Sequence, residues 1–255
     1  MNKKTTIQGL KIHYIKKGKK DPLVILHGWG GSSNSWSKII DSLSEKYTVI
    51  CPDLPGFGKS DDPKRAWNIN EYSDFVLDFL DKLKINDFYL LGHSFGGGIA
   101  IKITAKKPQL IKKLILCDAA IVRAKERLTP RQKIVKLGAK IVKPLKNNKI
   151  IESIKPLAYR LAGTKDYFSA NNLMKETFKK VRREDLRAFA SYIKKPTLII
   201  WGENDKITPL EDAYIIKDMI DEAELKIIED TDHSPHLRKP DELSKTIEDF
   251  IKKQV

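Results

Sequence analysis

The chain has 255 residues, a net charge of +15 and only two cysteines, Cys51 and Cys117. This length suits one large α/β domain, and the low cysteine count excludes a disulfide framework or a cysteine metal cluster. No apolar run approaches the roughly 18 residues of a membrane span, and the basic start lacks the apolar stretch of a signal peptide, so we expect a cytoplasmic protein.

Short apolar runs recur along the chain and predict the strands of a mostly parallel sheet. After an expected hairpin at 5–18, these runs occupy 22–28, 47–53, 88–94, 112–118, 196–202 and 224–230. They are rich in Val, Ile and Leu without polar alternation, which is typical of strands covered on both faces. Amphipathic patterns at 69–83 and 240–253 predict helices between and after them. This alternation of strands and helices indicates the α/β class.

The excess of positive charge lies in one internal segment. Residues 122–195 contain 21 Lys and Arg against 6 Asp and Glu, whereas the remainder contains 27 of each kind. Helical patterns punctuated by Pro156 and Gly163 continue through this segment. We therefore expect a helical cap at 122–195, inserted into a core formed by 1–121 and 196–255.

A glycine-rich turn interrupts the apolar run around residue 90. Gly92, Ser94 and Gly96 form the pattern G-x-S-x-G, after a predicted strand and before a predicted helix. That context is the one a nucleophile elbow requires. The two glycines relieve crowding where the strand and helix backbones meet. An ordinary glycine-rich turn is the alternative, but the context favours Ser94 as a nucleophile.

A serine hydroxyl becomes a good nucleophile only when a base removes its proton and a carboxylate orients that base. Asp205 lies just past a predicted strand, and His233 lies in the loop after the last one. The order Ser94, Asp205, His233 is therefore nucleophile, acid, base. Asp118, at the end of another strand, is a rival acid, and His236 is a rival base.

A second glycine-rich loop, "LHGWGGSSNSW", follows the strand near residue 25. Such a loop can present backbone N–H groups to the oxyanion of a tetrahedral intermediate. We expect the donors to be the amides of Trp29 and Phe95, the latter directly after the nucleophile. His27 and the adjacent Gly28 are expected to support the loop. We expect Trp36 either to pack against the cap or to line the pocket, and the sequence favours neither.

The segments "HGWGG", "PDLPGFGKSD", "GHSFGGG", "WGENDKITP" and "DHSPH" together resemble the α/β-hydrolase superfamily, in the branch with a helical cap. The resemblance runs from about residue 7 to the end of the chain and is weakest in the cap. The resemblance implies that Ser94 is the nucleophile, His233 the base and Asp205 the acid. It also implies that the amides of Trp29 and Phe95 form the oxyanion hole. One departure is Asp232, where relatives usually carry glycine.

The serine at the nucleophile position bears on the reaction. Members of the superfamily that open epoxides or displace halide use aspartate there, whereas serine points to acyl transfer. We expect hydrolysis of a carboxylic ester or thioester through an acyl-enzyme, with no metal and no cofactor. The alternatives are a carbon–carbon bond hydrolase of the same fold and a non-catalytic ligand-binding or receptor member.

The basic cap bears on the substrate. Residues 134–145 have an apolar stripe flanked by lysines, a pattern typical of a helix on anionic lipid. The favoured interpretation is a cap helix whose apolar face covers the pocket, and peripheral membrane contact is the alternative. We expect a small acyl substrate of anionic or lipid-like character, and no nucleic-acid partner, because aromatic residues are not interleaved in a base-stacking pattern.

Overall fold

The computed structural model describes residues 1–122 and 171–253. The chain divides into two compact units. One unit combines Met1–Arg123 with Lys180–Val255, and the other is Ala124–Lys179. Because a single sheet and the candidate site both lie in the first unit, the description below concentrates on it.

The inserted segment leaves and re-enters the first unit at neighbouring points. The backbone N–H of Leu186 donates to the carbonyl oxygen of Ile121 (3.0 Å), so the chain segments before and after the insertion are hydrogen-bonded to each other within the first unit. The expected helix at 134–145 lies outside the described residues. The cap, with boundaries at 122 and 195, therefore stays a prediction.

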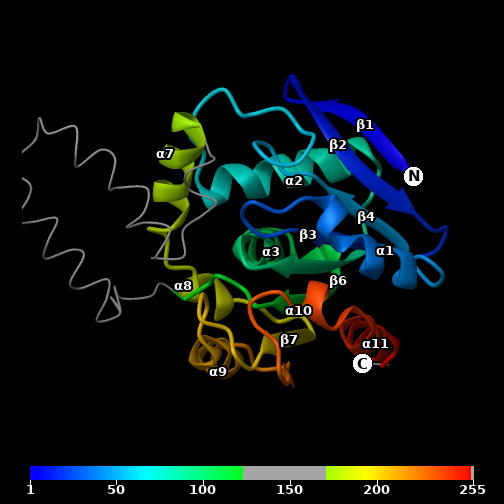
Figure 1. The fold of residues 1–255 in the computed structure, drawn as a ribbon, viewed down its shortest axis with the longest axis vertical. Helices are drawn as coiled ribbons and strands as arrows, with labels where there is room; N and C mark the ends of the chain where they lie inside the picture. Colours follow the sequence, from blue (N-terminus) through cyan, green and yellow to red (C-terminus); the bar gives the residue numbers. More distant parts are fainter. Residues whose placement is uncertain (123–170, 254–255) are drawn as a thin grey trace, which may run out of the picture. The chain divides into compact units, whose positions relative to one another are not determined.

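The first unit is built on an eight-stranded sheet in the described part of the chain (Figure 1). The spatial order is β1-β2-β4-β3-β5-β6-β7-β8, in which β1, β2 and β4 pair antiparallel and all pairs from β4 to β8 are parallel. The predicted N-terminal hairpin and the mostly parallel sheet are thereby confirmed. The strands are β1 (Asn2–Ile7), β2 (Leu10–Lys17), β3 (Pro22–Leu26), β4 (Thr48–Pro52), β5 (Phe88–His93), β6 (Ile111–Cys117), β7 (Thr197–Gly202) and β8 (Ala223–Ile228).

Helices flank the sheet. On one side α1 and α11 pack together over a core that includes Ile25, Ile115 and Ile200, whereas α2 and α3 pack against each other on the other side. The described helices of this unit are α1 (Ser37–Leu43), α2 (Ile69–Lys82), α3 (Phe95–Lys106), α8 (Arg187–Ala190), α9 (Leu210–Met219), α10 (Pro235–Arg238) and α11 (Pro240–Lys252), with 3-10 turns at Ser33–Trp36 and Pro108–Leu110. A further helix, α7 (Asn172–Val181), belongs mainly to the second unit.

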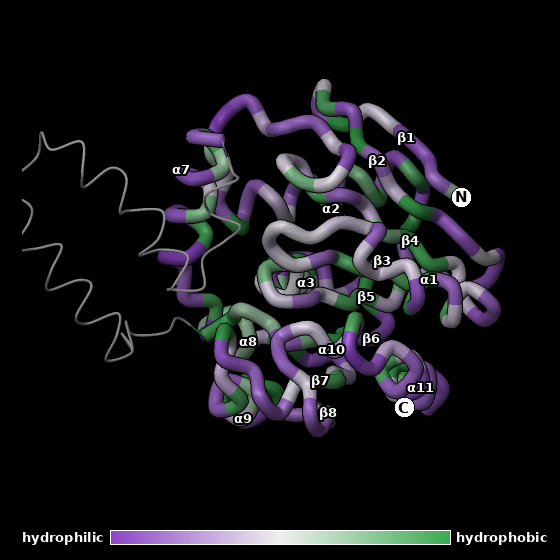
Figure 2. Tube along the Cα trace, in the orientation of Figure 1, coloured by the Kyte–Doolittle hydropathy of each residue, from purple (hydrophilic) through white to green (hydrophobic). Residues whose placement is uncertain are grey.

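Local sequence signals explain where these elements begin and which face they bury. At the start of α2, the Asn68 side chain accepts from the Glu71 N–H (2.9 Å) and the Glu71 side chain accepts from the Asn68 N–H (2.7 Å), which is a capping box. Every residue of β4 and β7 is buried, as expected for strands covered on both faces. Figure 2 shows the contrast between the mostly hydrophilic hairpin strand β1 and the hydrophobic central strands. Among the described helices, none is long and apolar enough to cross a membrane.

Candidate active site

Ser94 lies in the sharp turn between β5 and α3. Its φ is 51°, in the left-handed region that non-glycine residues rarely adopt. The flanking glycines are required sterically, because a Cβ at Gly92 would lie 2.4 Å from the carbonyl oxygen of Gly96, and a Cβ at Gly96 would lie 2.2 Å from that of Leu26. The Ser94 backbone is held from both sides, since its N–H donates to Cys117 (3.0 Å) and its carbonyl accepts from Ala120 (2.9 Å). The turn therefore presents the serine in one strained, fixed conformation.

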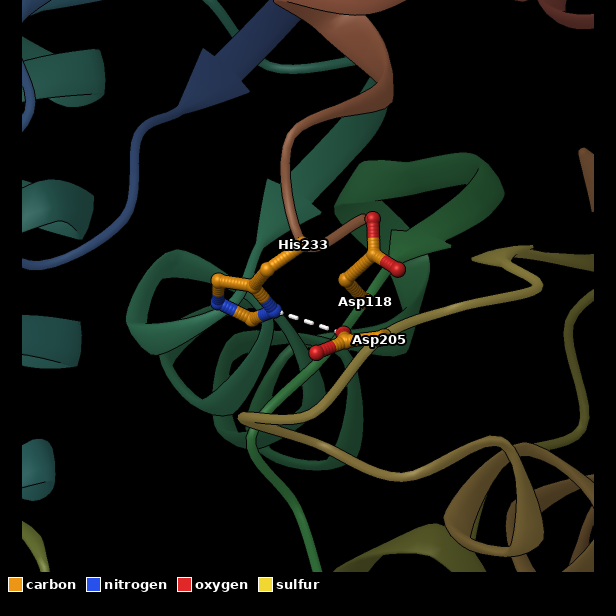
Figure 3. Close-up of side chains that lie close together, drawn as sticks. All are labelled: Asp118, Asp205 and His233. Atoms are coloured by element: carbon orange, nitrogen blue, oxygen red, sulfur yellow. Dashed lines mark hydrogen bonds and ion pairs between the residues drawn. The ribbon is translucent and has the colours of Figure 1, made fainter. Parts of the chain in front are cut away.

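A hydrogen-bonded chain connects three residues that are far apart in sequence. The Ser94 hydroxyl donates to Nε2 of His233 (2.8 Å), and Nδ1 of His233 donates to Oδ2 of Asp205 (2.6 Å; Figure 3). The three side chains come from the β5–α3 turn and from the loops after β7 and β8, all at the carboxyl edge of the parallel strands. This geometry can carry a proton from the hydroxyl to the imidazole while the carboxylate fixes the ring.

Asp205 is held in place by four hydrogen bonds. Its Oδ1 accepts from the N–H groups of Ile207 (2.7 Å) and Thr208 (3.1 Å). Its Oδ2 accepts from the Thr208 hydroxyl (2.7 Å) as well as from His233. Burial opposes ionisation of this carboxyl group, but the bonds from His233 and Thr208 outweigh it and lower the pKa of Asp205 below its usual range. Asp205 is therefore a carboxylate at neutral pH.

The rival acid, Asp118, lies beside this chain of hydrogen bonds. It is fully buried at the end of β6, where its Oδ1 accepts from the N–H of Gly202 (2.8 Å). Burial raises the pKa of Asp118 to about 7, and the nearby Asp205 adds to this shift. In the structure, Asp205 is the acid that bonds His233.

The rival base, His236, lies against the core. Its ring stacks on Trp36 with centroids 4.5 Å apart and an interplanar angle of 3°. Burial lowers the pKa of His236 to about 4, so it is neutral at physiological pH. Trp36 itself is fully buried in a core cluster that also contains residues of α1 and α11, and because most of the expected cap lies outside the described residues, packing against the cap or lining of the pocket stays a prediction for Trp36.

The glycine-rich loop after β3 is held by a buried histidine. Nδ1 of His27 donates to the carbonyl oxygen of Gly28 (2.8 Å), and its Nε2 accepts from the N–H of Leu54 (3.0 Å). Burial lowers the pKa of His27, consistent with this neutral tautomer. The aromatic rings of Trp29 and Phe95 pack edge to face with centroids 5.4 Å apart, so the two residues expected to donate to an oxyanion are neighbours. Phe95 is the first residue of α3, whose first N–H groups have no partner within the helix.

Two contacts escaped the sequence analysis. His93, the residue before Ser94 in the G-x-S-x-G pattern, donates from Nε2 to the backbone carbonyl of His233 (2.8 Å), and burial keeps its pKa well below the ordinary value. Thr208 supplies the hydroxyl that fixes Asp205. The only sequence signal for Thr208 is its place three residues after an aspartate in the loop that follows a strand, a spacing suited to a local side-chain turn. His93 offers no comparable signal.

Of the described residues, one group could hold a metal ion, and it overlaps this site. Asp118, Asp205 and His233 each offer one ligand atom within 4.8 Å of the others. Asp205 and His233 already satisfy each other by a hydrogen bond (2.6 Å). Two of the three possible ligands are therefore bonded to each other.

Comparison with known proteins finds hydrolases among the relatives of this chain. A family model described as alpha/beta hydrolase fold matches residues 21–240. The chain is 27% identical over 261 residues to lipase 1 of Psychrobacter immobilis, covering 96% of this chain and 82% of that protein. It is 29% identical over 266 residues to the 2-hydroxy-6-oxononadienedioate/2-hydroxy-6-oxononatrienedioate hydrolase of Escherichia coli, covering 95% and 91%. A solved membrane phospholipase A superposes with a TM-score of 0.80 at 23% identity, over 98% of this chain and 85% of that one.

Proposed function

Because this chain belongs to the alpha/beta hydrolase fold family, we propose that it is a serine hydrolase that cleaves carboxylic esters or thioesters through an acyl-enzyme. Hydrolases among its relatives support an enzyme. The observation that carries the proposal is the continuous hydrogen-bonded chain from the Ser94 hydroxyl through His233 to Asp205, with links of 2.8 and 2.6 Å. These hydrogen-bonding distances support Ser94 as the nucleophile, His233 as its base and Asp205 as the orienting acid.

The first half of the proposed reaction acylates the serine. Oγ of Ser94 attacks the carbonyl carbon of the substrate, and its proton passes to Nε2 of His233. The tetrahedral intermediate carries its negative charge on the former carbonyl oxygen. The intermediate collapses by breaking the bond to the alcohol or thiol, which takes the proton from His233 and leaves. Asp205 stabilises the imidazolium that forms between these two proton transfers.

The second half releases the acid. Water, deprotonated by His233, attacks the carbonyl carbon of the acyl-enzyme, and the Ser94 oxygen leaves with that proton. In both halves the backbone N–H groups of Trp29 and Phe95 donate hydrogen bonds to the oxyanion. Each of these hydrogen bonds stabilises the transition state by on the order of 3 kcal/mol. Their rings pack on Phe57 as well as on each other, which supports a rigid hole.

The substrate is proposed to be a small acyl compound of anionic or lipid-like character. The basic composition of 122–195 supports this choice, with 21 basic against 6 acidic residues. A second candidate reaction is hydrolysis of a carbon–carbon bond, because a relative named as a dienedioate hydrolase aligns over 95% of this chain. The same serine and base would serve that reaction, and no cofactor is included in either proposal.

The test is a panel of chromogenic esters and thioesters that vary in acyl length and charge, assayed beside a dienedioate ring-fission product. A phosphonate probe directed at serine is assayed in parallel. We expect ester turnover and a single phosphonate adduct on Ser94, both lost in Ser94→Ala and both kept in Ser191→Ala, which changes an exposed serine of the same chain. Turnover of the ring-fission product alone would select the second candidate. Absence of both turnover and labelling would favour a binding protein.

A further inference from the structure

Asp118 is a buried acid that the proposed reaction does not use, although it lies beside the residues that the reaction needs. One of its carboxylate oxygens is within 4.8 Å of ligand atoms of both Asp205 and His233. Figure 3 shows its carboxyl group next to the hydrogen-bonded pair, with no bond drawn to either partner. We propose that Asp118 is a second positioning acid, which takes over the orientation of His233 when Asp205 is not available. The inference rests on the proposed function, because it concerns the same base.

The topology brings the two acids together. β6 and β7 are neighbouring parallel strands, with Cys117 in register with Ile200. Asp118 follows β6 directly, whereas Asp205 lies three residues beyond the end of β7. Two adjacent strand ends therefore deliver two carboxyl groups to one histidine.

The two acids differ in how fully they are hydrogen-bonded. Asp205 uses both oxygens in four bonds. Asp118 has one backbone donor on Oδ1, from Gly202 (2.8 Å), and on Oδ2 only the weak thiol donor of Cys117 (3.4 Å). Oδ2 of Asp118 therefore keeps the capacity to accept a stronger hydrogen bond.

A purely structural role does not explain the carboxyl group. The one strong contact, from the N–H of Gly202, needs only an oxygen, which an asparagine of the same shape also supplies. Asp118 is 0% exposed, so burial opposes an ionisable acid here, whereas its φ of 45° is one that aspartate and asparagine tolerate equally. A buried acid beside the histidine that the proposed reaction uses fits a role in the reaction better than a role in folding.

The charges around Asp118 explain when it acts. The titratable groups that face it are Cys117 of β6, Asp205 after β7 and His233 after β8. Beside an ionised Asp205, burial and like-charge repulsion raise the pKa of Asp118 to about 7, so it holds a proton below that pH. Without the carboxylate at 205 this repulsion disappears, and Asp118 releases its proton to water more readily. The resulting carboxylate can then accept the Nδ1–H of His233 after a side-chain rotation.

The experiment compares Asp205→Ala, Asp118→Asn and the double variant in ester hydrolysis, with Ser94→Ala as the inactive reference. Loss of the orienting acid lowers kcat by about 10⁴ in a serine protease. We expect Asp205→Ala to lose no more than about 100-fold and the double variant to reach about 10⁴-fold, whereas Asp118→Asn alone stays within about tenfold of the unmodified chain. The matched control is Asp232→Asn in the Asp205→Ala background, because Asp232 is an exposed acid that pairs with Arg238 (3.0 Å). It should add no further loss.

Two readouts separate this role from a merely structural one. In Asp205→Ala the rate should depend on the ionisation of Asp118, because only its carboxylate form can then orient His233, and this dependence should vanish in the double variant. Equal kcat values for Asp205→Ala and the double variant would overturn the proposal.

A second measurement does not depend on turnover. Proton NMR of Asp205→Ala at pH 8 should keep a downfield ring N–H signal from His233, hydrogen-bonded to Asp118. Absence of this signal would also overturn the proposal, even if the double variant does not fold. If the unmodified chain turned over no substrate, the proposed function would fail while the NMR result still decided the role of Asp118.

Discussion

Replacing Asp118 by asparagine removes a buried carboxyl group and leaves an oxygen for the Gly202 N–H. Burial, opposed by that hydrogen bond and reinforced by Asp205, raises the pKa of Asp118 from 3.8 to about 7. The folded protein therefore favours the protonated acid more strongly than the unfolded chain does. The stability that this preference contributes is fully present below about pH 4 and is lost as the pH rises through 7. Asparagine does not titrate, so it avoids this loss.

The size of the effect follows from the difference between the two pKa values. One pKa unit corresponds to about 1.4 kcal/mol, so the ionised carboxyl group costs folding on the order of 4 kcal/mol at pH 8 and less than half of that at pH 5. The free energy of unfolding of Asp118→Asn, relative to the unmodified chain, should therefore rise by about 2 to 3 kcal/mol between these pH values. Any change in the Gly202 hydrogen bond that does not depend on pH cancels in this comparison.

The assay is urea unfolding at pH 5 and pH 8, followed by circular dichroism with both proteins in the same buffers. Asp232→Asn is the control that should show a constant difference between these pH values, because the Arg238 partner lowers the pKa of Asp232, so its contribution to stability is lost only as the pH falls below the ordinary value of 3.8. A stability difference between Asp118→Asn and the unmodified chain that stayed constant from pH 5 to pH 8, or that shrank, would refute the reasoning that Asp118 is a destabilising buried acid.

The remaining predictions concern groups around the reacting serine. Ser94→Ala should lower kcat by roughly 10⁶ while the dissociation constant of a non-hydrolysable ester analogue changes less than about threefold, measured by calorimetry. If Ser94→Ala lost binding of the analogue together with turnover, the result would contradict a role of Ser94 in the chemical step alone. Thr208→Val removes the hydroxyl donor of Asp205 and should lower kcat about tenfold with little change in KM, whereas Thr208→Ser should restore it; equal rates for both variants would argue against this hydroxyl. Gly96→Ala brings a Cβ to 2.2 Å from the Leu26 carbonyl, so both the unfolding midpoint and kcat should fall, and a variant with unchanged values would show that the turn is not constrained.

The fold was predictable because its signals are local. Uniformly apolar runs such as Thr48–Pro52 are distinct from the amphipathic stripe of α11, so strands and helices can be told apart along the chain. The hairpin begins earlier than expected, at Asn2, because β1 is a polar edge strand without an apolar run. The polar edge of the sheet is thus the part that periodicity detects least well.

The choice between the two acids depends on geometry that sequence does not encode locally. Asp118 and Asp205 both follow apolar strands, and their spacing from the strand end is the only visible difference. Three further residues let the chain turn, so that Asp205 meets the hydroxyl of Thr208 and the ring of His233, whereas Asp118 stays under the sheet edge beside Gly202. The contact of His93 with the His233 carbonyl likewise joins residues 140 positions apart, which only the folded chain brings together.

The most direct test of the central claim is to trap the acyl-enzyme. A chromogenic ester is mixed with the protein, the reaction is quenched in acid within milliseconds, and tryptic peptides are analysed by mass spectrometry. Cleavage after Lys84 and Lys102 releases residues 85–102, in which Ser94 is the only serine. The account predicts that this peptide gains the mass of the acyl group and that the adduct decays with the rate of turnover. Ester turnover without an adduct on Ser94, or with the acyl group on another residue, would contradict it.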